Sequence, residues 1–158
     1  MPPFQSLNPE HLGIAGEELT KIQRGALLHD IGKLGVPDDI LLKADSLSGD
    51  EWSIMRMHPE FARVMLDDIE YLHPSMAIPY CHHEKWDGTG YPRGLKGEDI
   101  PLAARIFSVV DVFDTLTHDR PYRVAAPVSE AFQYLSAQKG KQFEPRIVDL
   151  FMELYGQI

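Results

Sequence analysis

The sequence predicts an all-α fold, a compact multi-helix bundle. In several segments apolar residues recur at intervals of three and four, which is the pattern of an amphipathic helix. No stretch of useful length alternates apolar and polar residues, as a half-buried strand would. The 158 residues are 44% hydrophobic and 25% charged, so the chain is long and apolar enough to bury one core. We therefore expect a single domain over residues 1–158, without an internal boundary.

The first expected helix has its apolar face on Leu19, Ile22 and Ala26 and ends before Gly32. His29 continues this face near the C-terminal end of the helix. Polar groups turned toward a core need partners, so His29 and the adjacent Asp30 are candidates for a functional site.

A second helix is expected to open at Ser48 and Glu51, which form the S-x-x-E pattern of a capping box. It should stop before Pro59, because the residue before a proline disfavours the helical conformation. Pro59 is suited to the first position of a new helix. His58 therefore lies at a helix break.

The next short helix is expected to begin at Pro74 and to end in His82 and His83. The segment from Trp86 to about Asp99 is rich in glycine and proline and has no apolar period, which predicts a loop. Long loops in compact domains are often functional.

The most apolar helix is expected after Pro101, and it carries Asp111. Two further helices should follow, one ending at Gly140 and the other carrying Ile147, Val148, Phe151 and Leu154. We expect the helix after Pro101 to be the central helix of the bundle.

Charge and composition exclude some classes of protein. The formal charge of −9 argues against a domain that binds long nucleic acid through its phosphates, although a small anionic substrate is compatible with it. The sequence contains no run of about 18 apolar residues, which is the length that a membrane-spanning helix needs. Residues 1–8 lack the features of a signal peptide, and the only cysteine, Cys81, suits a reducing compartment. We expect a cytoplasmic protein.

Six potential metal ligands fall at helix ends or inside the most apolar helix. Imidazole and carboxylate together suit Fe, Mn or Zn, whereas a structural zinc site would usually contain cysteine pairs. Six ligands can hold more than one ion, and a carboxylate such as Asp30 can bridge two cations that activate water and neutralise a phosphoryl group. The six residues are His29, Asp30, His58, His82, His83 and Asp111.

The alternative for each histidine alone is a core residue satisfied by a hydrogen bond, and His11, His73 and His118 are interpreted in that way. For Asp111 the alternative is a solvated carboxylate. A buried carboxylate in an apolar helix would be costly without a cation, and the grouping of the six residues favours the metal site.

Four motifs in order resemble the HD superfamily of metal-dependent phosphohydrolases and, within it, the HD-GYP group. They are residues 29–33 (HDIGK), 82–92 (HHEKWDGTGYP), 111–114 (DVFD) and 119–123 (DRPYR). The resemblance extends from about Leu19 to Phe151. It implies an all-helical domain with a centre of two or three divalent transition metals, most often Fe or Mn. The implied reaction is hydrolysis of cyclic di-GMP to pGpG or GMP.

The resemblance also implies roles for individual residues. The six ligands above match the metal ligands of the family, with Asp30 in the bridging place. Lys33, Arg120 and Arg123 match positions directed at the phosphates of the substrate, and their alternative is an ordinary surface charge. Asp114 lies one helical turn after Asp111, near the same pocket.

The mechanism that we expect is attack on phosphorus by a water held between the metals, with Asp30 and Lys33 as the catalytic residues. Lys33 and the arginines would offset charge on the phosphate oxygens. Glu84 is left out of the expected catalytic set, because the helix end can equally explain its place. The loop of Gly90, Tyr91 and Pro92 could stack on a guanine, receive another signalling domain or be a structural turn.

The sequence departs from the family at its beginning. The family brings a further His or Glu ligand from a helix well upstream of the His-Asp pair, and only 28 residues precede His29 here. That helix and any upstream sensor or receiver domain are expected to be absent, which leaves the ion of His29 and Asp111 one ligand short. Two alternatives to the enzyme therefore stand: a weakly active or inactive module that binds a ligand or protein, and a hydrolase of another nucleotide.

Overall fold

The computed structural model describes residues 14–119 and 124–155, and within these ranges the regular structure is helical. The predicted all-α fold is confirmed. Helices labelled η are 3-10 helices. In chain order the elements are α1 (Gly16–Leu28), η3 (Ile31–Gly35), α2 (Asp38–Leu41), α3 (Gly49–Met55), α4 (His58–Asp67), η4 (Glu70–Ser75), α5 (Ala77–Cys81), η5 (Gly97–Asp99), α6 (Leu102–Thr117), α7 (Val128–Ala137) and α8 (Pro145–Tyr155).

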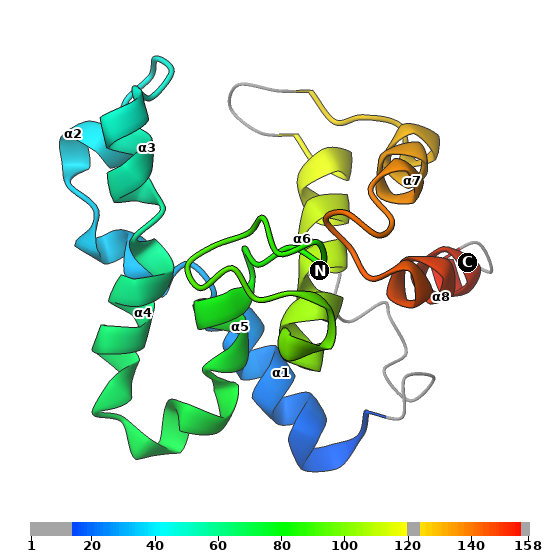
Figure 1. Ribbon diagram of the computed structural model, residues 1–158, viewed down its shortest axis with the longest axis horizontal. Coiled ribbons are helices and arrows are strands. Elements are labelled where there is room, and N and C mark those ends of the chain that lie inside the picture. The colour runs from blue at the N-terminus through cyan, green and yellow to red at the C-terminus, as the bar shows by residue number, and fades with distance from the viewer. Residues whose placement is uncertain (1–13, 120–123, 156–158) are drawn as a thin grey trace.

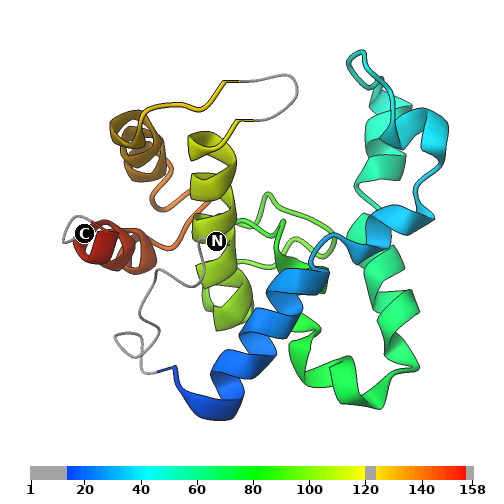
Figure 2. The same cartoon turned by 180° about the vertical axis from the view of Figure 1, so that it is seen from behind.

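Helix α6 runs through the middle of the molecule, as predicted for the most apolar helix. It packs against α7 and α8 on one side and against α5 on the other (Figure 1). Helix α4 packs on α5, and α1 crosses behind α5, as the view from the back shows (Figure 2). None of the described helices has the length and apolarity needed to cross a bilayer.

The main hydrophobic core surrounds α6. Val109 and Phe113 are almost completely buried, and the ring of Phe113 lies 4.7–5.5 Å from the rings of Phe132, Phe151 and Tyr155. Such aromatic contacts add to the free energy gained by burying apolar area. These contacts pack α6 against α7 and α8 and so fix the position of the helix that carries Asp111.

The helix break around His58 forms almost as predicted. Glu51 N–H donates to Ser48 Oγ (3.3 Å) and Ser48 N–H donates to Glu51 Oε2 (2.7 Å), which completes the capping box of α3. Helix α4 begins at His58 itself, so that Pro59 is its second residue rather than its first. At this break the His58 side chain is buried, with 2% of its surface exposed.

Two of the predicted boundaries considered next differ from the structure. Pro74 lies inside η4 instead of opening a helix, and α5 begins only at Ala77. Helix α7 ends at Ala137, before a turn in which Gly140 has a φ of +74°. Helix α1 ends at Leu28, before Gly32 as predicted, and the chain continues as η3.

Gly32 allows η3 to touch α4. A Cβ at Gly32 would lie 1.8 Å from the backbone oxygen of His58 and 2.6 Å from the backbone nitrogen of Ala62. No side chain fits at such distances, so the sequence needs glycine here. The contact brings the segment around Asp30 against the start of α4.

We expect Gly32→Ala to lower the free energy of unfolding by about 3 kcal/mol, because a methyl group would force η3 away from α4. Urea denaturation followed by circular dichroism would measure the change. Gly49→Ala is the matched control, since nothing lies within 4 Å of its Cβ position. Equal unfolding midpoints for the two variants would contradict this interpretation of Gly32.

Candidate metal centre

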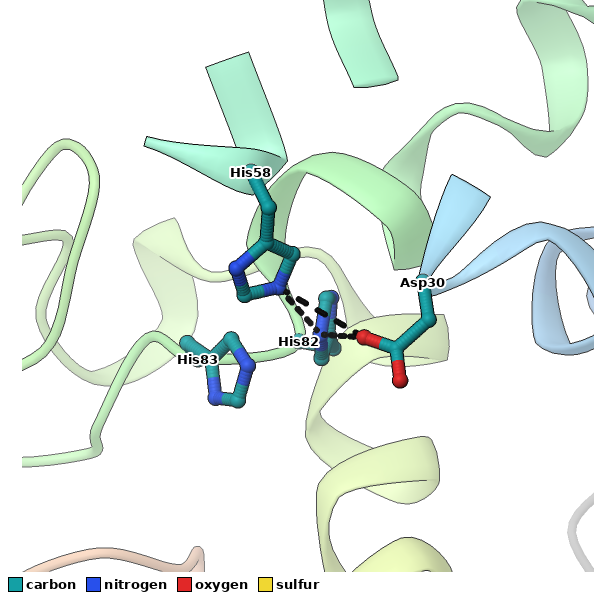
Figure 3. A group of neighbouring side chains, drawn as sticks. All are labelled: Asp30, His58, His82 and His83. Atoms are coloured by element: carbon teal, nitrogen blue, oxygen red, sulfur yellow. Dashed lines mark hydrogen bonds and ion pairs between the residues drawn. The ribbon is translucent and has the colours of Figure 1, made fainter. Parts of the chain in front are cut away.

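Four of the predicted ligands converge on one point. Asp30 follows α1, His58 opens α4, and His82 and His83 follow α5. One nitrogen or oxygen from each side chain lies within 4.8 Å of those from the other three. Figure 3 shows the three imidazole rings and the carboxylate directed toward a common centre.

The backbone determines which nitrogens of the rings face this centre. Nδ1 of His58 lies 2.8 Å from the Met55 carbonyl oxygen, and Nδ1 of His82 lies 3.0 Å from that of Ile78. A carbonyl oxygen only accepts, so each Nδ1 donates its proton. The two Nε2 atoms then carry lone pairs and face each other at 3.4 Å. Metal-binding histidines usually have this outer hydrogen bond, which orients the ring, and a cation would satisfy both lone pairs.

The rings are also kept neutral. Burial lowers the pKa of His82 to about 3 and that of His83 to about 2, and neighbouring histidines add to the effect. Burial lowers the pKa of His58 as well. Neutral imidazole is the form that binds metal ions, so the three rings are prepared for a cation at neutral pH.

The Asp30 carboxylate has a different neighbour on each oxygen. Oδ1 lies 3.6 Å from Nε2 of His58, whereas Oδ2 lies 2.6 Å from Nζ of Lys33 and 3.3 Å from Nε2 of His29. Burial alone would raise the pKa of Asp30, but the hydrogen bonds and charges of His29 and Lys33 hold it well below the usual value. The ionised carboxylate thus lies between the three-histidine cluster and His29.

His29 lies on the second side of Asp30, together with the charge of Asp111. Its Nδ1 is 2.8 Å from the Ala26 carbonyl oxygen, which leaves Nε2 facing Asp30. Burial opposes protonation, but the hydrogen bond to Asp30 and the charges of Asp30 and Asp111 raise the pKa of His29. His29 and the partly buried Asp111 are outside the group of four within 4.8 Å.

The remaining predicted residues lie in different places. Lys33 is bound to Asp30. Asp114 pairs with His118, whose Nδ1 lies 2.9 Å from Oδ1 of Asp114, and its predicted contact with substrate stays a prediction. Arg120 and Arg123 lie outside the described residues.

The loop of Gly90, Tyr91 and Pro92 folds back onto the histidine pair. Tyr91 N–H donates to the backbone oxygen of His83 (3.2 Å), and the Tyr91 ring stacks on the His83 ring at 4.7 Å and 20°. A Cβ at Gly90 would lie 2.3 Å from the backbone nitrogen of Lys85, so this close return requires glycine. The loop therefore forms one wall of the cluster.

Glu84 anchors this loop. Its side chain is buried to 3% exposure, and its two oxygens accept the backbone N–H groups of Arg93 (2.8 Å) and Leu95 (2.9 Å). Sequence reasoning left Glu84 without a role, because its partners are backbone groups 9 and 11 residues further on and leave no trace in the pattern of side chains. The structure assigns it to the support of the loop.

Comparison with known proteins identifies the class. Residues 9–147 match the family described as HD domain. The chain belongs to this family, and its motifs and relatives make it an HD-GYP domain. The resemblance inferred from the sequence is confirmed.

Among its relatives, the cyclic di-GMP phosphodiesterase response regulator RpfG of Xanthomonas campestris is 43% identical over 94% of this chain and 40% of its own length. A cyclic di-GMP phosphodiesterase of Thermotoga maritima is 40% identical over 94% and 41%. The 3'3'-cGAMP-specific phosphodiesterase 2 of Vibrio cholerae is 41% identical over 89% and 27%. The chain thus spans less than half the length of these relatives.

The fold is similar to those of two solved structures. The HDG"Y"P protein Bd1817 from Bdellovibrio bacteriovorus superposes with a TM-score of 0.72 at 23% identity, over 94% of this chain and 47% of that protein. A cyclic GMP-AMP specific phosphodiesterase from V. cholerae superposes with a TM-score of 0.70 at 19% identity, over 98% and 42%. These similarities support the helical architecture described above.

We expect Glu84→Gln to loosen the loop while the rest of the fold stays intact. The amide keeps the shape, but it is neutral and presents an NH₂ group where an oxygen accepts, at a cost of about 2–3 kcal/mol. Hydrogen exchange of the Arg93 and Leu95 amides should become faster. Glu98→Gln is the control, because Glu98 belongs to the same loop region and is 76% exposed. Unchanged exchange in Glu84→Gln would disprove the anchoring role.

The lowered pKa of His82 predicts how stability depends on pH in the metal-free protein. Folding lowers the pKa of His82 from 6.5 to about 3. At pH values between these two, His82 is protonated in the unfolded chain but not in the folded chain, so the free energy of unfolding falls as the pH drops. From pH 7 to pH 5 the loss from His82 should be about 2 kcal/mol.

Urea unfolding at both pH values, with a chelator present, would measure this loss. His82→Gln should show a smaller decrease in stability than the unchanged chain, whereas His73→Gln, at an exposed histidine, should show the same decrease. An equal decrease in His82→Gln would refute the assignment to His82.

Proposed function

We propose that this chain is a metal-dependent phosphodiesterase that hydrolyses cyclic di-GMP to pGpG or GMP. The observation that carries the proposal is the cluster of three neutral imidazoles and one ionised carboxylate within 4.8 Å. The names of relatives at 40–43% identity support the substrate. Imidazole and carboxylate donors are compatible with Fe or Mn, which are the metals that the family resemblance implies and that we propose here. We also propose the cytoplasm as the compartment.

We propose that the ligands form two groups that share Asp30. His58, His82, His83 and Oδ1 of Asp30 would hold one ion. Oδ2 of Asp30, His29 and Asp111 would contribute to a second ion, and we do not need a third to account for these residues. When bound, such ions act as Lewis acids and lower the pKa of coordinated water toward neutrality.

The residues of the chain orient and neutralise the substrate. Lys33, held 2.6 Å from Asp30, is placed to offset negative charge on a phosphate oxygen beside the cluster. Stabilisation of this kind is often the largest catalytic contribution. Arg120 and Arg123 are proposed to bind the phosphates with their guanidinium groups, and Asp114 is proposed as a further substrate-binding residue. Tyr91 and the loop around it exclude water from one side of the cluster, and the same loop is the proposed contact for another signalling domain.

A second substrate, 3',3'-cGAMP, is favoured by the name of the V. cholerae relative at 41% identity. Both substrates are cyclic dinucleotides that contain guanine, so the reaction at phosphorus would be the same. A module that binds without turnover is the remaining alternative, and the experiment below separates it from the enzyme.

We expect His58→Ala and Asp30→Ala to lose bound transition metal and turnover while helical content stays unchanged, since both supply ligands at the shared centre. Protein purified without oxygen would be assayed for metal content and for hydrolysis of cyclic di-GMP with Fe or Mn. His73→Ala is the control, because His73 is exposed and outside the cluster. Complete absence of transition metal in the unchanged chain would overturn the proposal, and full turnover in Asp30→Ala would overturn the bridging role.

A further inference from the structure

A hollow of about 560 Å³ lies next to the metal cluster, between α4 and the loop of Tyr91. Its volume is in the range of small-ligand sites. Arg56, Glu60, Phe61 and Tyr91 supply the polar and aromatic groups of its lining.

The hollow and the metal cluster share a wall. The Tyr91 ring, which lines the hollow, stacks on His83 at 4.7 Å and lies 6.4 Å from the ring of His58. Arg56 and Glu60 stand two residues before and two residues after His58. A nucleotide whose phosphate lies at the cluster has its base one sugar away, on the side of the neighbouring residues. The hollow is therefore within reach of a base of the proposed substrate.

The lining suits a flat aromatic ring. Tyr91 offers a ring face, and the guanidinium carbon of Arg56 lies 5.6 Å from the centre of that ring. Bases stack on aromatic rings and on guanidinium planes. The exposed Arg56 side chain is long enough to swing outward and then cover the outer face of a base. Such stacking does not depend on which base is bound.

Glu60 supplies the part that can distinguish one base from another. Tyr80 O–H donates to Oε1 (3.0 Å) and Arg63 Nε–H donates to Oε2 (3.1 Å), which holds the carboxylate in place. Each carboxylate oxygen can accept a further hydrogen bond, and the side chain is 30% exposed. Guanine has two adjacent donors, N1–H and the N2 amino group, that match two acceptor oxygens. Adenine has a lone pair at N1, which a carboxylate repels.

We infer that this hollow binds a guanine of the cyclic dinucleotide, stacked on Tyr91 and recognised at N1 and N2 by Glu60. The inference rests on the proposed function, because it takes the phosphate of that substrate to lie at the metal cluster. Glu60 is then a specificity-determining residue, whereas Arg56 and Tyr91 bind any base in the hollow.

The test compares Glu60→Gln with the unchanged chain. The variant keeps the size of the side chain but can accept with only one oxygen. Metal-loaded protein would be assayed for kcat/KM on cyclic di-GMP, 3',3'-cGAMP and cyclic di-AMP, and calorimetry on metal-free protein would give the Kd of each. The preference for cyclic di-GMP over cyclic di-AMP should fall about tenfold or more, since a paired hydrogen-bond contact contributes about 1–3 kcal/mol of discrimination.

Glu130→Gln is the matched control. Glu130 is the third residue of α7 as Glu60 is the third of α4, and it is exposed. This variant should keep the preference of the unchanged chain. It therefore corrects for the loss of a negative charge in the first turn of a helix.

The outcomes separate the inference from the proposed function. If the unchanged chain cleaves cyclic di-GMP and Glu60→Gln keeps its preference, the guanine site is overturned and the phosphodiesterase stands. If the unchanged chain neither binds nor cleaves any of the three compounds, both are overturned. Should Glu60→Gln fail to fold, Arg56→Lys serves instead: it should raise the Kd of cyclic di-GMP and cyclic di-AMP alike, about threefold or more, and unchanged affinities would overturn the site.

Discussion

The site depends on two unprotonated ring nitrogens that are forced to face each other. Nε2 of His58 and Nε2 of His82 lie 3.4 Å apart, and each ring has already used its Nδ1 proton on a backbone carbonyl. Burial makes protonation of either ring costly, so the protein cannot relieve the repulsion by taking up a proton. A cation between the rings would satisfy both lone pairs, which links the fold to the proposed metal binding.

Backbone contacts impose this arrangement on the side chains. Helix α4 begins at His58, so the break between α3 and α4 lies at a proposed metal ligand. Gly32 brings η3 into contact with α4 and carries Asp30 toward His58. The end of α5 presents His82 and His83 in adjacent positions. Because each ligand is placed by the end of a helix and not by a flexible loop, little conformational entropy is lost when an ion binds.

The sequence predicted the helical class, the central helix and the histidines at helix ends, because apolar period, capping box and proline positions are local signals. It predicted Asp30 and His58 as candidates but could not show that Gly32 lets them meet, since this depends on a contact between distant segments. The start of α5 was misplaced because Pro74 fits a 3-10 turn as well as a helix start. Glu84 was missed because it binds backbone groups, which any sequence possesses.

The loop of Tyr91 couples recognition of the base to the metal cluster. One face of its ring meets His83, and the same side chain lines the hollow that contains Glu60. Glu84 directly follows His83, and its buried side chain holds the return of this loop through two hydrogen bonds. The ligand pair, the loop anchor and the base platform are therefore consecutive parts of one short segment. A base that shifts Tyr91 would press on the His83 ring stacked against it, so this contact is a direct physical route from the hollow to the cluster.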